Sequence, residues 1–194
     1  MSATQTSTAA RHSSITSFAT LLTAAVVCSA MIALPAHAQR SFSRSGQHGS
    51  VNASSSVKGN TINGQASING SRGGSASGEG SATYNVRSGT ASASGTATGT
   101  TANGGTATAN GSGTYNPSTG AVGATGSISG TSANGGTASA SGSGSYTPGS
   151  GASGSATVTS ANGTTHSGSV TASQGTATVT NNAGQSKTYV KGSH

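Results

Sequence analysis

The sequence has little with which to build a conventional protein core. Among its 194 residues there is no Trp, and aromatic residues make up only 3% of the chain. After residue 38 there is no Leu, Met or Cys, and the larger apolar residues are Val, Ile, Tyr and one Phe. Such chains rarely bury enough surface to offset the entropy of ordering. A conventional globular core is therefore excluded, and disulfides cannot replace it.

Acidic residues are almost absent. The chain has 8 Lys and Arg but a single acid, Glu79, so its formal net charge is +7. Catalysis by paired carboxylates needs two acids, and a Ser-His-Asp arrangement needs a carboxylate that orients the histidine. The histidines after residue 38 lie far apart, without the spacing of metal ligands: His48, His166 and His194. The inventory predicts a protein that is not an enzyme and has no metal or other cofactor.

The positive charge is thinly spread. No run of Lys and Arg occurs, and aromatic residues are few, so specific nucleic-acid binding is not predicted. Arg40 and Arg44 are able to touch an anionic surface, although basic residues that only aid solubility are the simpler interpretation.

Residues 1–38 differ from the rest of the chain and have the pattern of an export signal. Arg11 provides a weakly basic start, and the densest apolar run extends from Leu21 to Leu34. Ala36 and Ala38 form a small-x-small site, which predicts cleavage after Ala38. A retained membrane helix is the alternative, but Ser and Thr interrupt the apolar run. We expect a secreted, periplasmic or cell-surface protein that contacts the membrane only through this signal helix.

The rest of the chain repeats. Tyr84, Tyr115 and Tyr146 lie 31 residues apart, and each closes a segment in which polar residues alternate with Ala, Gly and Tyr. A fixed period of this size indicates a repeat architecture, and strict alternation is the strand period. One repeat thus corresponds to one hairpin with its two turns, and the tyrosines should align on every second strand.

Turn sequences separate these alternating segments. One kind contains Asn-Gly pairs, in which both residues tolerate the positive φ of tight hairpins: Asn103-Gly104, Asn134-Gly135 and Asn162-Gly163. The other kind follows the tyrosines and contains Gly, in two cases after Pro. We predict strands over residues 75–84, 90–101, 106–115, 121–132, 137–146, 152–160, 164–172, 175–180 and 186–191.

These patterns predict an all-β protein, an extended antiparallel β-meander of 31-residue hairpin repeats after the N-terminal signal helix. The expected organisation is a signal peptide over 1–38, a flexible basic leader over 39–69 and a Ser/Thr/Gly/Ala-rich repeat domain over 70–194. A largely disordered low-complexity chain is the alternative.

Three functions remain open. The first is a non-enzymatic structural protein of a surface or matrix, which associates with itself through strand edges or binds cell-surface or matrix polymers. The second is a binding module that uses a flat hydroxyl face on glycans or ice; the candidate residues are Thr96, Thr98, Thr106, Thr108, Thr157, Thr159, Thr176 and Thr178. These tripeptides resemble the Thr-x-Thr arrays of ice-binding β-proteins. The third is a disordered secreted spacer.

Overall fold

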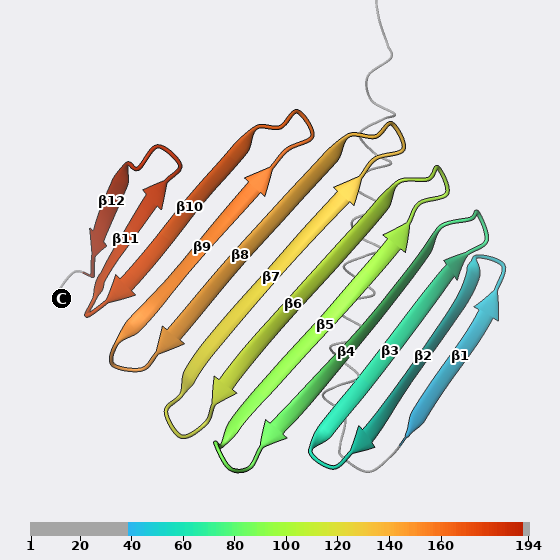
Figure 1. The fold of residues 1–194 in the computed structure, drawn as a ribbon, viewed down its shortest axis with the longest axis horizontal. Helices are drawn as coiled ribbons and strands as arrows, with labels where there is room; N and C mark the ends of the chain where they lie inside the picture. Colours follow the sequence, from blue (N-terminus) through green and yellow to red (C-terminus); the bar gives the residue numbers. More distant parts are fainter. Residues whose placement is uncertain (1–38, 192–194) are drawn as a thin grey trace, which may run out of the picture.

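The computed structural model describes residues 39–191, which form one antiparallel β-sheet (Figure 1). Its 12 strands lie side by side in sequence order, so each strand pairs with the strands before and after it in the chain. The meander interpretation is correct, and the disordered alternative is wrong for this part of the chain. The predicted signal peptide over 1–38, with Ala36 and Ala38, lies outside the described residues.

The strands are long for a chain so rich in small residues. Their bounds are β1 Arg40–Gly46, β2 Gly49–Lys58, β3 Thr61–Gly70, β4 Ser75–Asn85, β5 Thr90–Thr100, β6 Thr106–Asn116, β7 Ala121–Thr131, β8 Thr137–Thr147, β9 Gly151–Thr159, β10 Thr165–Ser173, β11 Thr176–Asn181 and β12 Ser186–Val190. All nine strands predicted from the sequence are present, and their ends differ from the prediction by at most 1 residue.

The leader prediction for 39–69 needs correction, because β1, β2 and β3 lie in this segment and extend the same sheet. The alternation of apolar and polar residues is weaker here but present. Val51 pairs with Ile68, and Val57 pairs with Ile62, so large apolar side chains share one face across β2 and β3. The β2–β3 turn has only two residues, and Gly59 in it has a φ of 59°.

The Asn-Gly pairs lie in turns, as predicted, but with a different backbone conformation. Gly104, Gly135 and Gly163 have φ of 84°, 81° and 82°. The preceding asparagines do not have positive φ, since Gln174 is the only such non-glycine residue described. In the β5–β6 turn, Gly104 N–H donates to the Thr101 carbonyl at 3.0 Å. The conformation is therefore an ordinary turn followed by one left-handed glycine, and only the glycine needs positive φ.

The turns after Tyr84 and Tyr115 are each braced by the side chain of the asparagine that follows the tyrosine. Asn116 Oδ1 accepts hydrogen bonds from the backbone N–H groups of Ser118 and Thr119 at 3.0 and 3.3 Å. Gly120 N–H donates to the Asn116 carbonyl at 2.8 Å and has a φ of 68°. Such asparagine side chains replace missing backbone partners and hold the turn closed.

The register gives the sheet two chemically distinct faces. On β6 the hydroxyl face carries Thr106, Thr108, Asn110, Ser112 and Thr114, whereas the apolar face carries Ala107, Ala109, Gly111, Gly113 and Tyr115. Neighbouring strands pair like with like, as in the pairs Thr108–Ser129 and Ala109–Ile128. Successive strands therefore extend both faces across the sheet.

Apolar burial is shallow. The buried apolar residues are all alanines on the apolar face, namely Ala53, Ala66, Ala76 and Ala97. Of the 11 large apolar side chains that are exposed, all but Val86 and Val190 lie on this face. The order of the sheet therefore rests mainly on backbone ladders and turn geometry.

We predict that two glycine-to-alanine substitutions will have opposite effects. Gly104→Ala forces a side chain into a left-handed turn position and should lower the unfolding free energy by about 1–2 kcal/mol. Gly111→Ala adds a Cβ that meets the Thr125 carbonyl oxygen at an ordinary 3.5 Å, so stability should stay equal or rise slightly. Denaturant unfolding followed by circular dichroism measures both, and equal losses would contradict this account of the turns.

Candidate functional site

The three predicted tyrosines lie in one row across the apolar face. Tyr84 pairs with Ala91, which pairs with Tyr115, and the row continues through Val122 to Tyr146. The tyrosines thus occupy every second strand, as the 31-residue period predicts. Ala91 and Val122 lie between the tyrosines in the row. The backbone positions of neighbouring tyrosines are two strand spacings apart, which is roughly 9.4–9.8 Å.

A fourth tyrosine, which sequence reasoning missed, completes the row. The row passes from Tyr146 through alanines of β9, β10 and β11 to Tyr189 on β12. Tyr189 lies outside the 31-residue period, so only strand pairing reveals its place. The four side chains are 44%, 47%, 48% and 52% exposed, in chain order. The row is therefore accessible along its length.

All eight threonines proposed for a hydroxyl surface lie on the hydroxyl face. They come from β5, β6, β9 and β11, and each pairs with polar residues of the neighbouring strands, except that Thr176 has Ser173 on one side and Val190 on the other. The longest row runs from β2 to β12 and consists of Ser56, Asn63, Ser81, Ser94, Ser112, Thr125, Ser143, Ser155, Ser169, Thr180 and Ser186. The structure thus brings these hydroxyls together on one surface.

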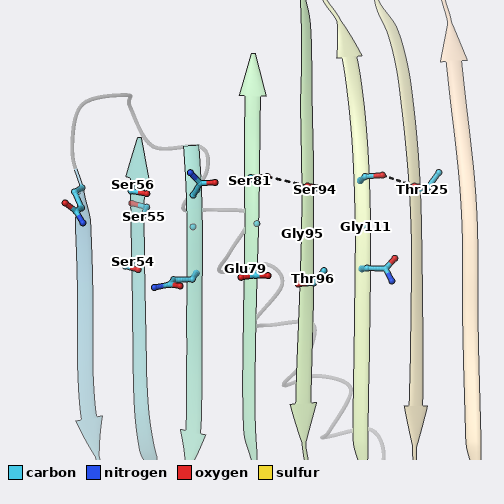
Figure 2. A pocket seen from close by; sticks show the side chains of 17 residues that line it. Ser54, Ser55, Ser56, Glu79, Ser81, Ser94, Gly95, Thr96, Gly111 and Thr125 are labelled. Carbon is cyan, nitrogen blue, oxygen red and sulfur yellow. Dashed lines mark hydrogen bonds between the residues drawn. The ribbon is translucent and has the colours of Figure 1, made fainter. Parts of the chain in front are cut away.

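Many hydroxyls on this face are drawn into pairs. The Thr108 and Ser129 hydroxyls hydrogen-bond to each other at 2.8 Å. The hydroxyl of Thr125 forms a similar bond with that of Ser112, at 2.9 Å (Figure 2). These distances are well below the strand spacing of roughly 4.7–4.9 Å. Short gaps within pairs therefore alternate with longer gaps, and the face departs from the even lattice that the Thr-x-Thr tripeptides suggest.

A shallow trough crosses the hydroxyl face from β2 to β6. Its floor is the backbone of a row of glycines, Gly64, Gly80, Gly95 and Gly111, and polar side chains form its two sides. Glu79, the acid of the chain, lies here between Gln65 and Thr96 (Figure 2). With one carboxylate among amides and hydroxyls, the trough offers hydrogen bonds rather than paired acid–base chemistry.

The histidines are not brought together. His48 lies in the β1–β2 turn, and His166 lies on β10 beside Val158. Within residues 39–191, no three His, Cys, Asp or Glu side chains group in a way that suits a metal ion. The structure therefore assembles no metal centre from the described part of the chain.

Of the four Lys and Arg residues in the described strands, three lie on the two edge strands, and the fourth, Lys58, ends β2. Arg40 and Arg44 lie on β1 and Lys187 lies on β12, all three on the apolar face. The Lys187 ammonium lies 5.1 Å from the centroid of the Tyr189 ring. Strands β5 to β11 contain no Lys or Arg. The interior of both faces is therefore free of cations over these strands.

Comparison with known proteins identifies no family or relative of this chain. No protein-family model matches the chain, and no curated protein or solved structure is detectably similar to it. No helix among residues 39–191 is apolar and long enough to cross a membrane. The function must therefore be argued from the faces and edges of the sheet.

We predict that the hydroxyl pairs contribute little to stability individually. Thr108→Val removes an exposed hydrogen bond to Ser129 but adds a strong strand former, so the unfolding free energy should change by no more than about 0.5 kcal/mol. Ser129→Ala removes the other partner, and the double variant should cost less than the sum of the two. Denaturant unfolding of the three variants tests this; a loss above about 1.5 kcal/mol for Thr108→Val would contradict it.

Proposed function

We propose that this chain is an exported, non-enzymatic structural protein of a cell surface or extracellular matrix, and that it associates with itself through its strand edges. The observation that carries the proposal is the open sheet. Among the described strands, β1 and β12 each pair on one side only. An unpaired strand edge presents a row of N–H and C=O groups that can pair with another chain.

The strand number favours open-ended growth. All neighbours in the sheet are antiparallel and the sheet has 12 strands, so β1 and β12 run in opposite directions (Figure 1). A second copy placed beside the first by translation alone would therefore set its β1 antiparallel to β12. Its apolar and hydroxyl faces would continue those of the first copy. A contact of this head-to-tail kind does not close and yields extended assemblies.

The edge charges provide control over this association. Joining β12 to the β1 of a second copy brings Lys187 near Arg40 and Arg44 on the same face. Charged side chains on edge strands are a known protection against uncontrolled pairing. Repulsion between exposed charges is screened by salt, so ionic strength sets how readily the edges meet.

Export agrees with this role but rests on the sequence alone. A matrix or surface protein needs no catalytic groups, and the described residues are mostly Ser, Thr, Gly, Ala and Asn. The predicted signal peptide would deliver the chain outside the membrane that it crosses.

We predict that salt promotes assembly of the purified protein. Raising NaCl from about 0.01 M to 0.5 M shortens the Debye length from about 30 Å to a few ångström, so the edge cations no longer repel. Light scattering and sedimentation velocity should show particles that grow with salt, and electron microscopy should show extended forms.

Two charge variants sharpen this test. The double variant Arg44→Ser and Lys187→Ser should assemble at lower salt than the natural chain, because it removes one cation from each edge strand. The control Arg87→Ser removes a cation from the β4–β5 turn, away from both edges, and should not change the salt requirement. A protein that stays monomeric at every salt concentration, or an equal response of the control, would refute edge association.

The hydroxyl face supports an alternative function, because all eight candidate threonines share it. If the face binds ice, the protein should show thermal hysteresis, and Thr108→Val should reduce it without unfolding the sheet. Hysteresis that is absent, or that Thr108→Val leaves unchanged, excludes ice as the ligand.

A further inference from the structure

We propose that the tyrosine row, formed by Tyr84, Tyr115, Tyr146 and Tyr189, binds an extended β-1,4-linked polysaccharide. The site lies on the apolar face, opposite the hydroxyl face that the sequence suggested for glycans. It does not require that the chain assembles, so it can hold even if edge association fails.

The spacing of the tyrosines fits such a ligand. Tyr84, Tyr115 and Tyr146 occupy alternate strands in one cross-strand row, so the backbone positions that carry neighbouring rings are about 9.4–9.8 Å apart. An extended β-1,4-linked chain turns each sugar by half a rotation, so equivalent ring faces recur every disaccharide. The length of that disaccharide is close to two strand spacings. Each tyrosine can therefore meet the same face of every second sugar.

The row leaves the rings open for stacking. The residues between the first three tyrosines are Ala91 and Val122, which are much smaller than tyrosine. About half of each tyrosine is exposed, from 44% for Tyr84 to 52% for Tyr189. From Tyr84 to Tyr189, the row contains no side chain larger than its tyrosines.

The chemistry of the partner follows from these rings. A β-linked sugar has an apolar face of C–H groups, and aromatic rings offer large, rigid contact surfaces for it. The phenol hydroxyl adds a polar group at the ring edge, where the hydroxyls of a sugar lie. Tyr84, Tyr115 and Tyr146 lie beside the β4–β5, β6–β7 and β8–β9 turns, whose exposed polar residues lie along the same margin.

A second copy of this chain fits the row less well. Stacking two apolar faces would place the edge cations Arg40, Arg44 and Lys187 of both copies at the rims of one interface. Like charges oppose that arrangement, whereas a neutral polysaccharide brings no such repulsion. In an assembly built by translation, the row would also run along the direction of growth, parallel to a bound chain.

Binding to insoluble polysaccharides tests the proposal. The purified protein is mixed with microcrystalline cellulose, with chitin, and with insoluble starch as an α-linked control, and the bound fraction is measured by sedimentation. We expect binding to cellulose or chitin and none to starch. Comparing the bound fractions on cellulose and on chitin shows whether the protein prefers chains of glucose or chains of N-acetylated sugars.

Matched variants identify the surface that binds. Tyr115→Ala should weaken binding roughly tenfold, and the double variant with Tyr146→Ala should abolish it within the range measured. Tyr115→Phe keeps the ring and should bind nearly as the natural chain does. Val158→Ala, which shortens a 49% exposed side chain of the apolar face outside the row, should have no effect.

Several outcomes would overturn the proposal. Binding to neither β-linked polysaccharide would do so, as would binding that survives the double tyrosine variant or is lost equally with Val158→Ala. Sedimentation velocity without polysaccharide measures the oligomeric state of the natural chain and of the tyrosine variants. If the tyrosine variants change the oligomeric state while the natural chain binds no polysaccharide, the row is instead a contact between copies.

Circular dichroism checks that each variant keeps its sheet. If the alanine variants unfold, Tyr115→Leu takes their place, because it removes the aromatic ring but keeps a large apolar side chain on the strand. We expect Tyr115→Leu to bind about as weakly as Tyr115→Ala would. A folded Tyr115→Leu protein that binds as tightly as Tyr115→Phe would show that the ring makes no contact with the sugar.

Discussion

Backbone hydrogen bonding between neighbouring strands is the interaction on which this structure depends. The described residues contain no large side chain that is fully buried, so the usual gain from a hydrophobic core is small. Each strand is instead paired along nearly its whole length, and consecutive strands are joined by short turns. Short connections keep the entropic cost of closing each hairpin low. Small side chains allow long ladders to form without crowding.

The turns make this pairing specific. A slip of one residue would move every alanine and glycine to the hydroxyl face, since side chains alternate along a strand. Left-handed glycines such as Gly104 and asparagine-braced turns such as that of Asn116 hold each strand to one register. The same register aligns the tyrosines and separates the two faces. The candidate surfaces are thus consequences of turn geometry repeated along the chain.

The two faces and the two edges suit different partners. The hydroxyl face consists of hydroxyls that are partly satisfied by one another, as in the pair Ser143–Ser155 at 3.1 Å. The apolar face exposes aromatic rings and valines, and exposed apolar patches on proteins commonly mark interaction sites. The edge strands β1 and β12 have unpaired backbone N–H and C=O groups and carry the positive charges of Arg40, Arg44 and Lys187. A surface or matrix role uses all three without any catalytic group.

Much of the fold was predictable because local patterns and turn residues agree over 70–191. The strands of 39–69 were missed, since Arg40, Arg44 and Ser55 place polar side chains on the apolar face and no tyrosine marks the repeat. The prediction that both residues of the Asn-Gly turns have positive φ was also wrong. The same dipeptide occurs in two hairpin types that differ in loop length, and only one of them needs positive φ at the asparagine. The place of Tyr189 in the tyrosine row depends on pairing between β11 and β12, which lies outside the repeat period.

The amino-acid sequence by itself determined the strand period, the position of the turns, the separation of hydroxyl and apolar residues, and the absence of paired acids. These properties are local, so they can be read from neighbouring residues. Only the tertiary structure decided which hydroxyls meet as pairs, that four tyrosines share one row, and that the cations of β1 and β12 lie at opposite edges of one face. Those relations join residues far apart in the chain, and they exist only once every strand has taken its register.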